Sequence, residues 1–284
     1  MKLFGAVNVY YYPLKKDNPY KIVFHKEKMF IPPDMEVFKA CDDVQQEKLL
    51  VVSEGEKLLN NISRVKTKIR DYAFCNEWDY FVTFTFSDVN IDRYDLKEIK
   101  KRMGQFFNNY KKRKNPDFCY LLVPEFHKDG GVHFHGLVKG IRDLDLHEFT
   151  SIRSGSGYFI KCKADGRAIL SCSKLPVYIL NQLRKGLNVY DFYEFSQRFG
   201  YTTVEPIRNS DAAAHYICKY ITKDLVSLPL HTCCYLNSKG LKTPELLHQD
   251  FGGVLPKKLN YENDFVAIKW IDSLDDYANI LMDV

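Results

Sequence analysis

The chain has 284 residues, of which 45% are hydrophobic and 27% are charged, and its formal net charge is +5. This composition predicts a globular protein with a sizeable core. No stretch approaches the roughly 20 apolar residues needed to cross a bilayer, and the start at Met1 has no apolar segment of signal-peptide length. We therefore expect a soluble cytoplasmic protein, and we expect its eight scattered cysteines to be reduced thiols.

The charge is unevenly distributed. Residues 245–284 hold eight acidic and three basic side chains, so residues 1–244 hold 38 basic and 28 acidic ones, a net charge of +10. A basic body followed by an acidic tail is compatible with a polyanionic partner, although charge alone does not establish one.

The first part of the chain mixes tyrosines, prolines and short apolar runs over residues 1–40, which predicts a short hairpin or an irregular arm. From Asp42 to Tyr72 the apolar residues recur at near-helical spacing, which predicts one or two amphipathic helices. We divide the chain into an N-terminal arm and helical extension (1–75), a central domain (76–242) and an acidic C-terminal tail (243–284).

The central domain begins with an aromatic and β-branched run at 80–86, which predicts a strand. A helix is expected over 92–114 because its apolar residues form a stripe. Strands at 119–126 and 132–138, joined by a turn at 128–131, predict a hairpin. The remaining elements are expected as a helix at 143–150, a strand at 157–162, a helix at 177–185, a strand at 201–205 and a helix from 212 to 224 with N-cap residues at 209–211.

Strands that alternate with helices but include a direct hairpin predict an α+β fold, with a mainly antiparallel sheet and helices on one face. On the second hairpin strand, His133 and His135 are two residues apart and therefore share one face. Glu125 on the first strand can approach them across the turn. Two imidazoles and a carboxylate suit a divalent ion without selecting one, and His127 is an alternative ligand. The other interpretation is a surface or hydrogen-bonded histidine pair.

Tyr216 and Tyr220 are four residues apart and share one face of the last helix. Tyrosines at this spacing often line a core, but each has a lysine companion, Lys219 or Lys223, in a repeated Y-x-x-K unit. A tyrosine phenol with a pKa near 10 costs on the order of 4 kcal/mol to ionise at neutral pH. Ammonium groups or a metal nearby could lower that cost, so the parts suggest one nucleophilic site for DNA nicking.

Three segments resemble, in order, the three motifs of HUH endonucleases: Phe81 to Phe86, His133-Phe134-His135, and Tyr216 to Lys223. Over residues 78–242 the chain is similar to rolling-circle replication initiators of bacteriophages and small plasmids. The tyrosine helix is most similar to that of the gene A-type phage initiators, and the rest resembles replication-associated proteins of Gram-positive plasmids and phages. The resemblance implies a five-stranded antiparallel sheet with the histidines on a central strand.

The resemblance also implies a Mg²⁺- or Mn²⁺-dependent cut of single-stranded DNA at a replication origin, with a 5′-phosphotyrosine link and a free 3′ hydroxyl. It makes His133 and His135 metal ligands, Glu125 the third ligand, and Tyr216 and Tyr220 the nucleophiles. Such enzymes act with one or two tyrosines. We rank Tyr216 slightly ahead because its lysine follows at the spacing found in single-tyrosine relatives.

Other functions remain open on the sequence. A relaxase or a single-strand transposase would share the chemistry, a nucleic-acid-binding module would use the aromatics without catalysis, and a metallohydrolase would use water as its nucleophile. The chain lacks a G-x-x-x-x-G-K-[ST] segment, so no ATP-binding P-loop is recognisable. We therefore expect a separate helicase and a separate DNA polymerase as partners.

Overall fold

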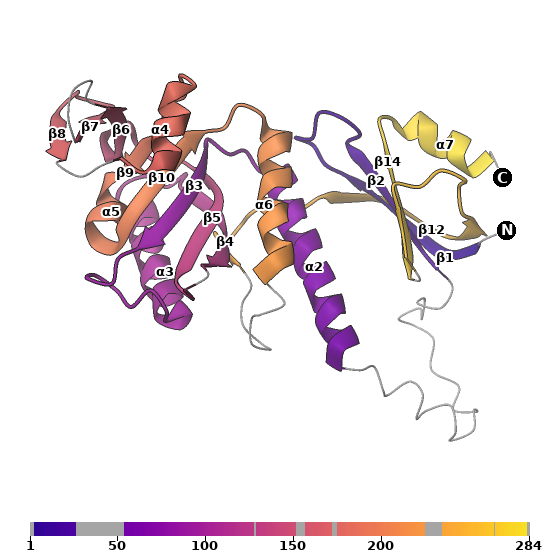
Figure 1. Ribbon diagram of the computed structural model, residues 1–284. Coiled ribbons are helices and arrows are strands. Elements are labelled where there is room, and N and C mark those ends of the chain that lie inside the picture. The colour runs from indigo at the N-terminus through magenta and orange to yellow at the C-terminus, as the bar shows by residue number, and fades with distance from the viewer. Residues whose placement is uncertain are drawn as a thin grey trace. The chain divides into compact units, whose positions relative to one another are not determined.

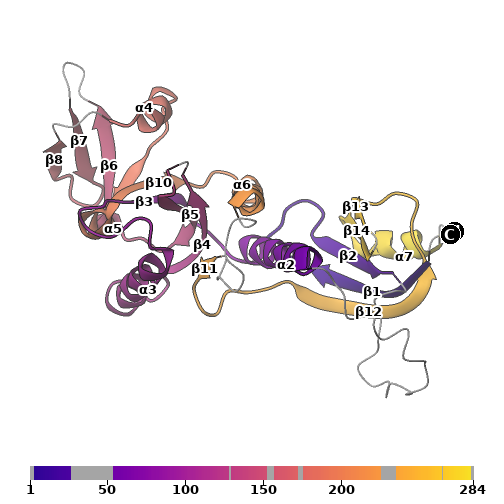
Figure 2. The same cartoon turned by 60° about the horizontal axis from the view of Figure 1, so that its bottom comes forward.

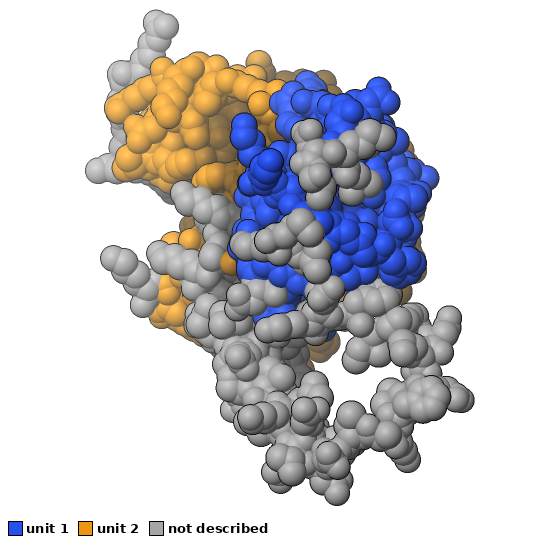
Figure 3. All heavy atoms as spheres, turned by 90° about the vertical axis from the view of Figure 1, so that its right-hand side faces the viewer, with its two compact units in different colours: residues 1–64, 74–76, 242–284 blue, residues 65–73, 77–241 orange. Residues whose placement is uncertain are grey.

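The structure, a computed structural model, describes residues 3–26, 54–127, 129–151, 157–171, 175–224, 235–263 and 265–282. The chain divides into two compact units, coloured separately in Figure 3. The first comprises residues 1–64, 74–76 and 242–284, and the second comprises residues 65–73 and 77–241. Among the described residues, no helix combines the length and the apolar character that a membrane crossing requires.

The second unit contains an antiparallel sheet of nine strands among its described residues, in the order β11, β4, β5, β3, β10, β9, β6, β7, β8 (Figure 1). The α+β prediction is confirmed, but the sheet is wider than the five strands that the family resemblance implied. The strands are β3 (Tyr80–Phe86), β4 (Cys119–Phe126), β5 (Val132–Lys139), β6 (Leu146–Ser151), β7 (Tyr158–Cys162), β8 (Ala168–Ser171), β9 (Tyr190–Phe192), β10 (Gly200–Pro206) and β11 (Leu236–Asn237).

The helices of this unit lie on both faces of the sheet, whereas we expected them on one (Figure 2). They are α3 (Leu96–Arg113), α4 (Val177–Arg184), α5 (Tyr193–Phe199) and α6 (Ser210–Asp224). Asp95 caps α3 because its carboxylate accepts from the backbone N–H groups of Lys97 and Glu98. The α3 stripe packs on the even-numbered side chains of β3, and the main core joins Tyr80, Val82, Phe84 and Phe86 to Ile99, Met103, Phe106, Phe107 and Tyr110.

The opposite face of the sheet carries the odd-numbered side chains of β3 and the two histidines of β5. Thr83 pairs in register with His135, and Thr85 pairs with His133. Helix α6 contacts β4 and β5 on this face, where its Ala214 is fully buried. The sheet therefore separates an aromatic core from a face that carries polar, chemically active side chains.

The helix expected at 143–150 is wrong. The structure has one 3-10 turn, η2 (Asp143–Asp145), followed by strand β6. This strand pairs with β7 on one side and β9 on the other, so its backbone hydrogen bonds are made between strands. Local spacing could not reveal these partners because β9 is more than 40 residues downstream.

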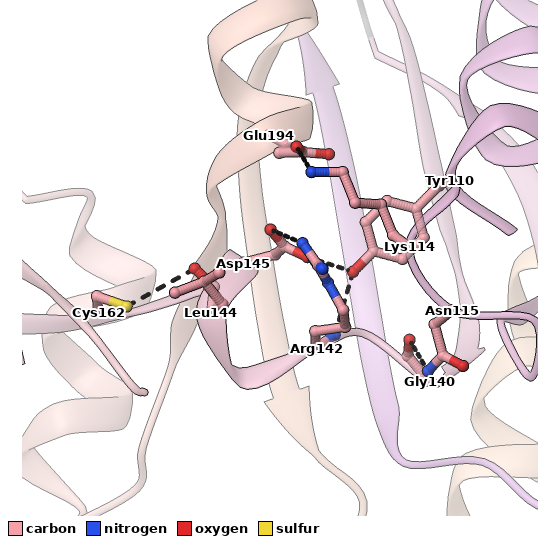
Figure 4. Close-up of polar contacts among 9 residues, drawn as sticks. All are labelled: Tyr110, Lys114, Asn115, Gly140, Arg142, Leu144, Asp145, Cys162 and Glu194. Carbon is pink, nitrogen blue, oxygen red and sulfur yellow. Dashed lines mark hydrogen bonds and ion pairs between the residues drawn. The ribbon is translucent and has the colours of Figure 1, made fainter. Parts of the chain in front are cut away.

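A buried polar network fixes the connection that leads into β6 (Figure 4). The Tyr110 hydroxyl at the end of α3 donates to Asp145 Oδ2 over 2.6 Å, and Arg142 donates to both carboxylate oxygens, over 2.8 and 3.0 Å. Asp145 is only 5% exposed, so the fork-shaped guanidinium supplies the partner that a buried carboxylate needs. The network ties α3 to the start of the outer strands.

The first unit contains a five-stranded antiparallel sheet in the order β12, β1, β2, β14, β13. The predicted N-terminal hairpin is confirmed as β1 (Leu3–Tyr11) and β2 (Tyr20–His25). The C-terminal segment, whose structure the sequence left open, supplies β12 (Glu245–Val254), β13 (Tyr261–Glu262), β14 (Val266–Ile271) and α7 (Leu274–Met282). Arm and tail thus share one core, which includes Phe4, Val9, Ile22, Phe24, Ala267 and Ile271.

The helical extension expected over 42–72 is found as one helix, α2 (Glu54–Cys75). The first part of that prediction, residues 42–53, lies outside the described residues.

Candidate active site

Strand β5 brings the predicted ligands together because it lies between β3 and β4. His133 pairs in register with Glu125 of β4, and His135 pairs with Val123. Residues directly opposite each other in antiparallel strands share a face, so both histidines and Glu125 project to the same side of the sheet. The prediction that these three residues are neighbours follows from strand alternation and holds in the structure.

Two threonines of β3 hold the histidine rings. Thr83 Oγ1 lies 3.0 Å from His135 Nδ1, and Thr85 Oγ1 lies 3.1 Å from His133 Nδ1. In both rings Nδ1 is therefore engaged by a hydroxyl. This arrangement fixes the ring orientation and leaves Nε2 as the nitrogen that can meet a ligand. The sequence analysis did not single out these threonines.

Glu125 contacts one of the two histidines directly. Its Oε2 lies 2.6 Å from His135 Nε2, and the side chains are 32% and 12% exposed respectively. The carboxylate therefore accepts a hydrogen bond from the imidazole at the edge of the histidine cluster.

His133 is held in its neutral form. Burial, with a further contribution from the charges of His127 and His135, lowers the pKa of His133 to about 4. His127, which we considered as an alternative ligand, lies with its ring centroid 3.7 Å from that of His133. A neutral imidazole is the form that binds metal ions, so His133 needs no deprotonation at neutral pH.

The donor set suits a divalent ion in kind, because it combines imidazole nitrogens with a carboxylate. Within the described parts of the chain, however, no three His, Cys, Asp or Glu side chains are arranged as a metal site. Neighbouring ligands around Mg²⁺ lie about 3 Å apart. The 2.6 Å contact between Glu125 and His135 would therefore have to open for both atoms to hold one ion.

Helix α6 carries the predicted nucleophile to the same face. Asn209 Oδ1 accepts from the backbone N–H of Ala212 at the helix start, as an N-cap does. Ile217 is fully buried, while the neighbouring Tyr216 side chain is 45% exposed. The burial of one helix face against the sheet leaves Tyr216 at its edge.

Phe81 joins Tyr216 to the histidine cluster. The Tyr216 ring meets the Phe81 ring edge-on with centroids 5.1 Å apart, and the Phe81 ring stacks on His135 with centroids 6.2 Å apart. Tyr216 and the cluster of Glu125, His133 and His135 line one cavity of about 960 Å³. The side chains of the other predicted site residues, Lys219, Tyr220 and Lys223, lie outside the described residues, although their backbone belongs to α6.

The cavity extends past the predicted residues onto the outer strands. Phe149 of β6, Tyr158 and Ile160 of β7, Tyr178 of α4 and Tyr201 of β10 form an aromatic and apolar wall. The sequence analysis missed this wall. Its aromatic residues were visible, but they converge only because β6 is a strand, and the sequence predicted a helix there.

A family model for replication-associated proteins of the ORF2 type matches residues 79–225. These 147 residues are just over half of the 284-residue chain. The chain belongs to this family of replication-associated proteins. The match extends from the residue before β3 to the residue after α6, so this replication-associated protein carries the whole cluster and the tyrosine helix within the family region. No curated protein and no solved structure matches the chain.

Proposed function

We propose that this replication-associated protein initiates replication by nicking single-stranded origin DNA through attack by Tyr216 on a backbone phosphate. The supporting observation is that Tyr216 lines the same cavity as Glu125, His133 and His135, with the Phe81 ring against both Tyr216 and His135. A relaxase or a single-strand transposase would use the same chemistry. Family membership favours replication over both.

In the proposed step the Tyr216 phenol oxygen forms a bond to phosphorus, and the bond from phosphorus to the 3′ oxygen breaks. The downstream DNA remains attached to Tyr216 through its 5′ phosphate. The released 3′ oxygen takes up a proton and becomes a hydroxyl, which a DNA polymerase can extend once a helicase has opened the duplex. Reversal of the step rejoins the strand.

His133, His135 and Glu125 are the residues that would hold a Mg²⁺ or Mn²⁺ ion. When bound, such an ion neutralises charge on the phosphate and stabilises the leaving oxygen. The threonine hydroxyls at 83 and 85 keep the two imidazoles oriented for that task.

The rest of the tyrosine helix completes the proposal. Tyr220 would supply a second nucleophile one helical turn from Tyr216, and Lys219 and Lys223 would favour the phenolate form by their charge. One tyrosine could then hold the DNA while the other attacks.

The test uses a pool of single-stranded oligonucleotides with a randomised centre and a label at the 3′ end. Incubation with Mn²⁺ should give a labelled adduct that survives boiling in detergent, because the 3′-terminal fragment stays on the protein. Chelation of the metal before mixing should abolish the adduct. Cleaved fragments without an adduct would instead support a metallohydrolase.

The variant Tyr216→Phe should lose most or all of the adduct. Tyr261→Phe is the matched control, because Tyr261 is also about half exposed but lies on β13 in the other unit. An undiminished adduct in Tyr216→Phe would exclude Tyr216 as a required nucleophile.

A further inference from the structure

A second cavity of about 490 Å³ adjoins the main one. The two cavities share Phe81, Tyr178 and Tyr216 in their linings. Beyond these three rings the second cavity is lined mostly by side chains that can donate or accept hydrogen bonds, namely Gln182, Asn188, Glu205, Arg208 and Asn209. We call this second cavity the base pocket.

Glu205 is placed in the base pocket by β-sheet register. It pairs with Phe81 across β10 and β3, so its carboxylate and the Phe81 ring stand side by side on the same face of the sheet. The Tyr178 hydroxyl donates to Glu205 Oε1, and Gln182 Nε2 donates to the Tyr178 hydroxyl over 2.9 Å. One carboxylate oxygen is thus fixed by a chain of two hydrogen bonds from α4.

The Tyr178 hydroxyl stays in its donating form. Burial, together with the hydrogen bond to Glu205, raises the pKa of Tyr178 above its usual value. The hydrogen bond from Tyr178 engages Oε1 of Glu205 and leaves Oε2 without a partner among the described residues. The carboxylate is therefore oriented by Tyr178 through one oxygen, and its other oxygen can receive donors from a ligand.

A carboxylate at this place does not suit a phosphate, because both are negative. It suits the edge of a nucleobase that presents N–H groups. Among the four DNA bases, guanine offers adjacent imino and amino donors on the edge that is free in a single strand, and single-stranded bases stack on aromatic rings. Phe81, Tyr178 and Tyr216 supply such rings around Glu205.

We propose that the base pocket takes one unpaired guanine of the DNA strand and recognises it through Glu205. This inference rests on the proposed function in that the ligand is the strand that Tyr216 would cut. Because Tyr216 forms part of the wall between the two cavities, the guanine lies within one or two nucleotides of the cut phosphate. Glu205 would then determine part of the nicking sequence.

The experiment selects single-stranded DNA by binding alone. The full chain is mixed, in the presence of a chelator, with a pool of oligonucleotides that has ten randomised positions, and the retained DNA is sequenced. The wild-type protein should enrich guanine at one position of the recovered sequence motif. Glu205→Gln puts an amide donor in place of the carboxylate, so it should reduce that enrichment about tenfold, at that position only.

Two further variants make the test specific. Glu98→Gln is the matched control, because Glu98 is an exposed carboxylate on α3, on the other face of the sheet, and it should leave the selected motif unchanged. Tyr178→Phe removes the donor that orients Glu205 and should weaken the guanine preference. It also tests the proposal if Glu205→Gln does not fold, which a thermal unfolding curve reveals.

Unchanged guanine enrichment in folded Glu205→Gln, or the absence of guanine preference in the wild-type protein, would overturn the base pocket. Guanine selection without any Mn²⁺-dependent adduct would support the pocket and overturn the nicking function instead. Failure to retain any single-stranded DNA would overturn both.

Discussion

At the scale of single residues, the two threonines beside the histidines have the clearest predicted effect. Replacing Thr83 and Thr85 together with valine removes the hydroxyls that engage His135 and His133 at Nδ1. Loss of such an orienting partner typically lowers metal affinity or activity about 10- to 100-fold. We expect a loss of about that size in Mn²⁺ affinity, measured by titration calorimetry, and in the rate of adduct formation.

Thr150→Val is the control for this double variant, because Thr150 is exposed on β6. It should leave both Mn²⁺ affinity and the adduct rate unchanged. Wild-type values in the Thr83 and Thr85 double variant would show that the hydroxyls do not orient the rings.

A buried aspartate predicts how stability depends on pH. Burial raises the pKa of Asp191 from 3.8 to about 6, although Ser196 and Thr202 donate hydrogen bonds to it. The folded state therefore binds a proton more tightly than the unfolded state does. The stabilisation is complete below about pH 4 and is lost as the pH rises to about 6, a change on the order of 3 kcal/mol.

Urea unfolding at several values between pH 4 and pH 7 measures this dependence. Asp191→Asn carries no titrating group, so its free energy of unfolding should lack the decrease that the wild-type protein shows over this interval. A decrease of equal size in both proteins would assign the pH dependence to other groups.

The site residues were predictable from the sequence where strand and helix periods determine the geometry. The two-residue spacing of His133 and His135, and the hairpin that places Glu125 opposite them, determined their common face before any fold was known. Thr83 and Thr85 were missed because their role depends on the register between β3 and β5. That register is set by tertiary pairing and has no local signal.

At the scale of elements, the close packing of β4 against β5 depends on one glycine. A Cβ atom added to Gly136 would lie 2.2 Å from the backbone oxygen of Leu121 and 2.5 Å from Leu122 Cδ2. Both neighbours belong to β4, so the strands would have to separate where the histidine strand is centred.

Gly136→Ala should therefore lower the free energy of unfolding by about 1–3 kcal/mol, as overpacking does. The adduct should decrease with it, because Glu125 and His135 are positioned by these two strands. Gly104→Ala is the control, since no atom lies within 4 Å of a Cβ built on that helical glycine. Equal stability of the two variants in urea unfolding would contradict the close approach.

The elements that were predicted correctly are those with a strong local pattern. Strands β3 and β4 have the predicted bounds, because aromatic and β-branched runs of that length leave little choice. The segment at 143–150 was wrong because its conformation is set by neighbours on both sides, β7 and β9, and not by its own spacing. The base pocket and the aromatic wall depend on these outer elements, so sequence reasoning could not reach them.

At the scale of the whole molecule, the two ends of the chain form one structure. Strand β1 pairs with β12, and β2 pairs with β14, so residues 243–284 cover the core that Phe4 and Phe24 enter. Charge had marked this segment as an acidic tail, yet its strands are integral to a sheet.

Deletion of residues 243–284 should therefore unfold the sheet of the first unit and expose its core. We expect loss of strand signal in circular dichroism and binding of a hydrophobic dye. Removal of only residues 283 and 284, which lie beyond α7, is the control and should leave both signals unchanged. A fully folded deletion variant would mean that β1 and β2 are stable without their partners.

The most direct test of the central hypothesis is the identity of the residue that carries the DNA. Trypsin cuts after Arg208, Lys219 and Lys223, so it places Tyr216 and Tyr220 in separate peptides, 209–219 and 220–223. After adduct formation with Mn²⁺ and nuclease trimming, mass spectrometry should find a nucleotide linked through phosphate to Tyr216 in peptide 209–219. A nucleotide only on peptide 220–223, or no modified tyrosine in a reaction that cuts the DNA, would contradict the assignment of Tyr216 as the nucleophile.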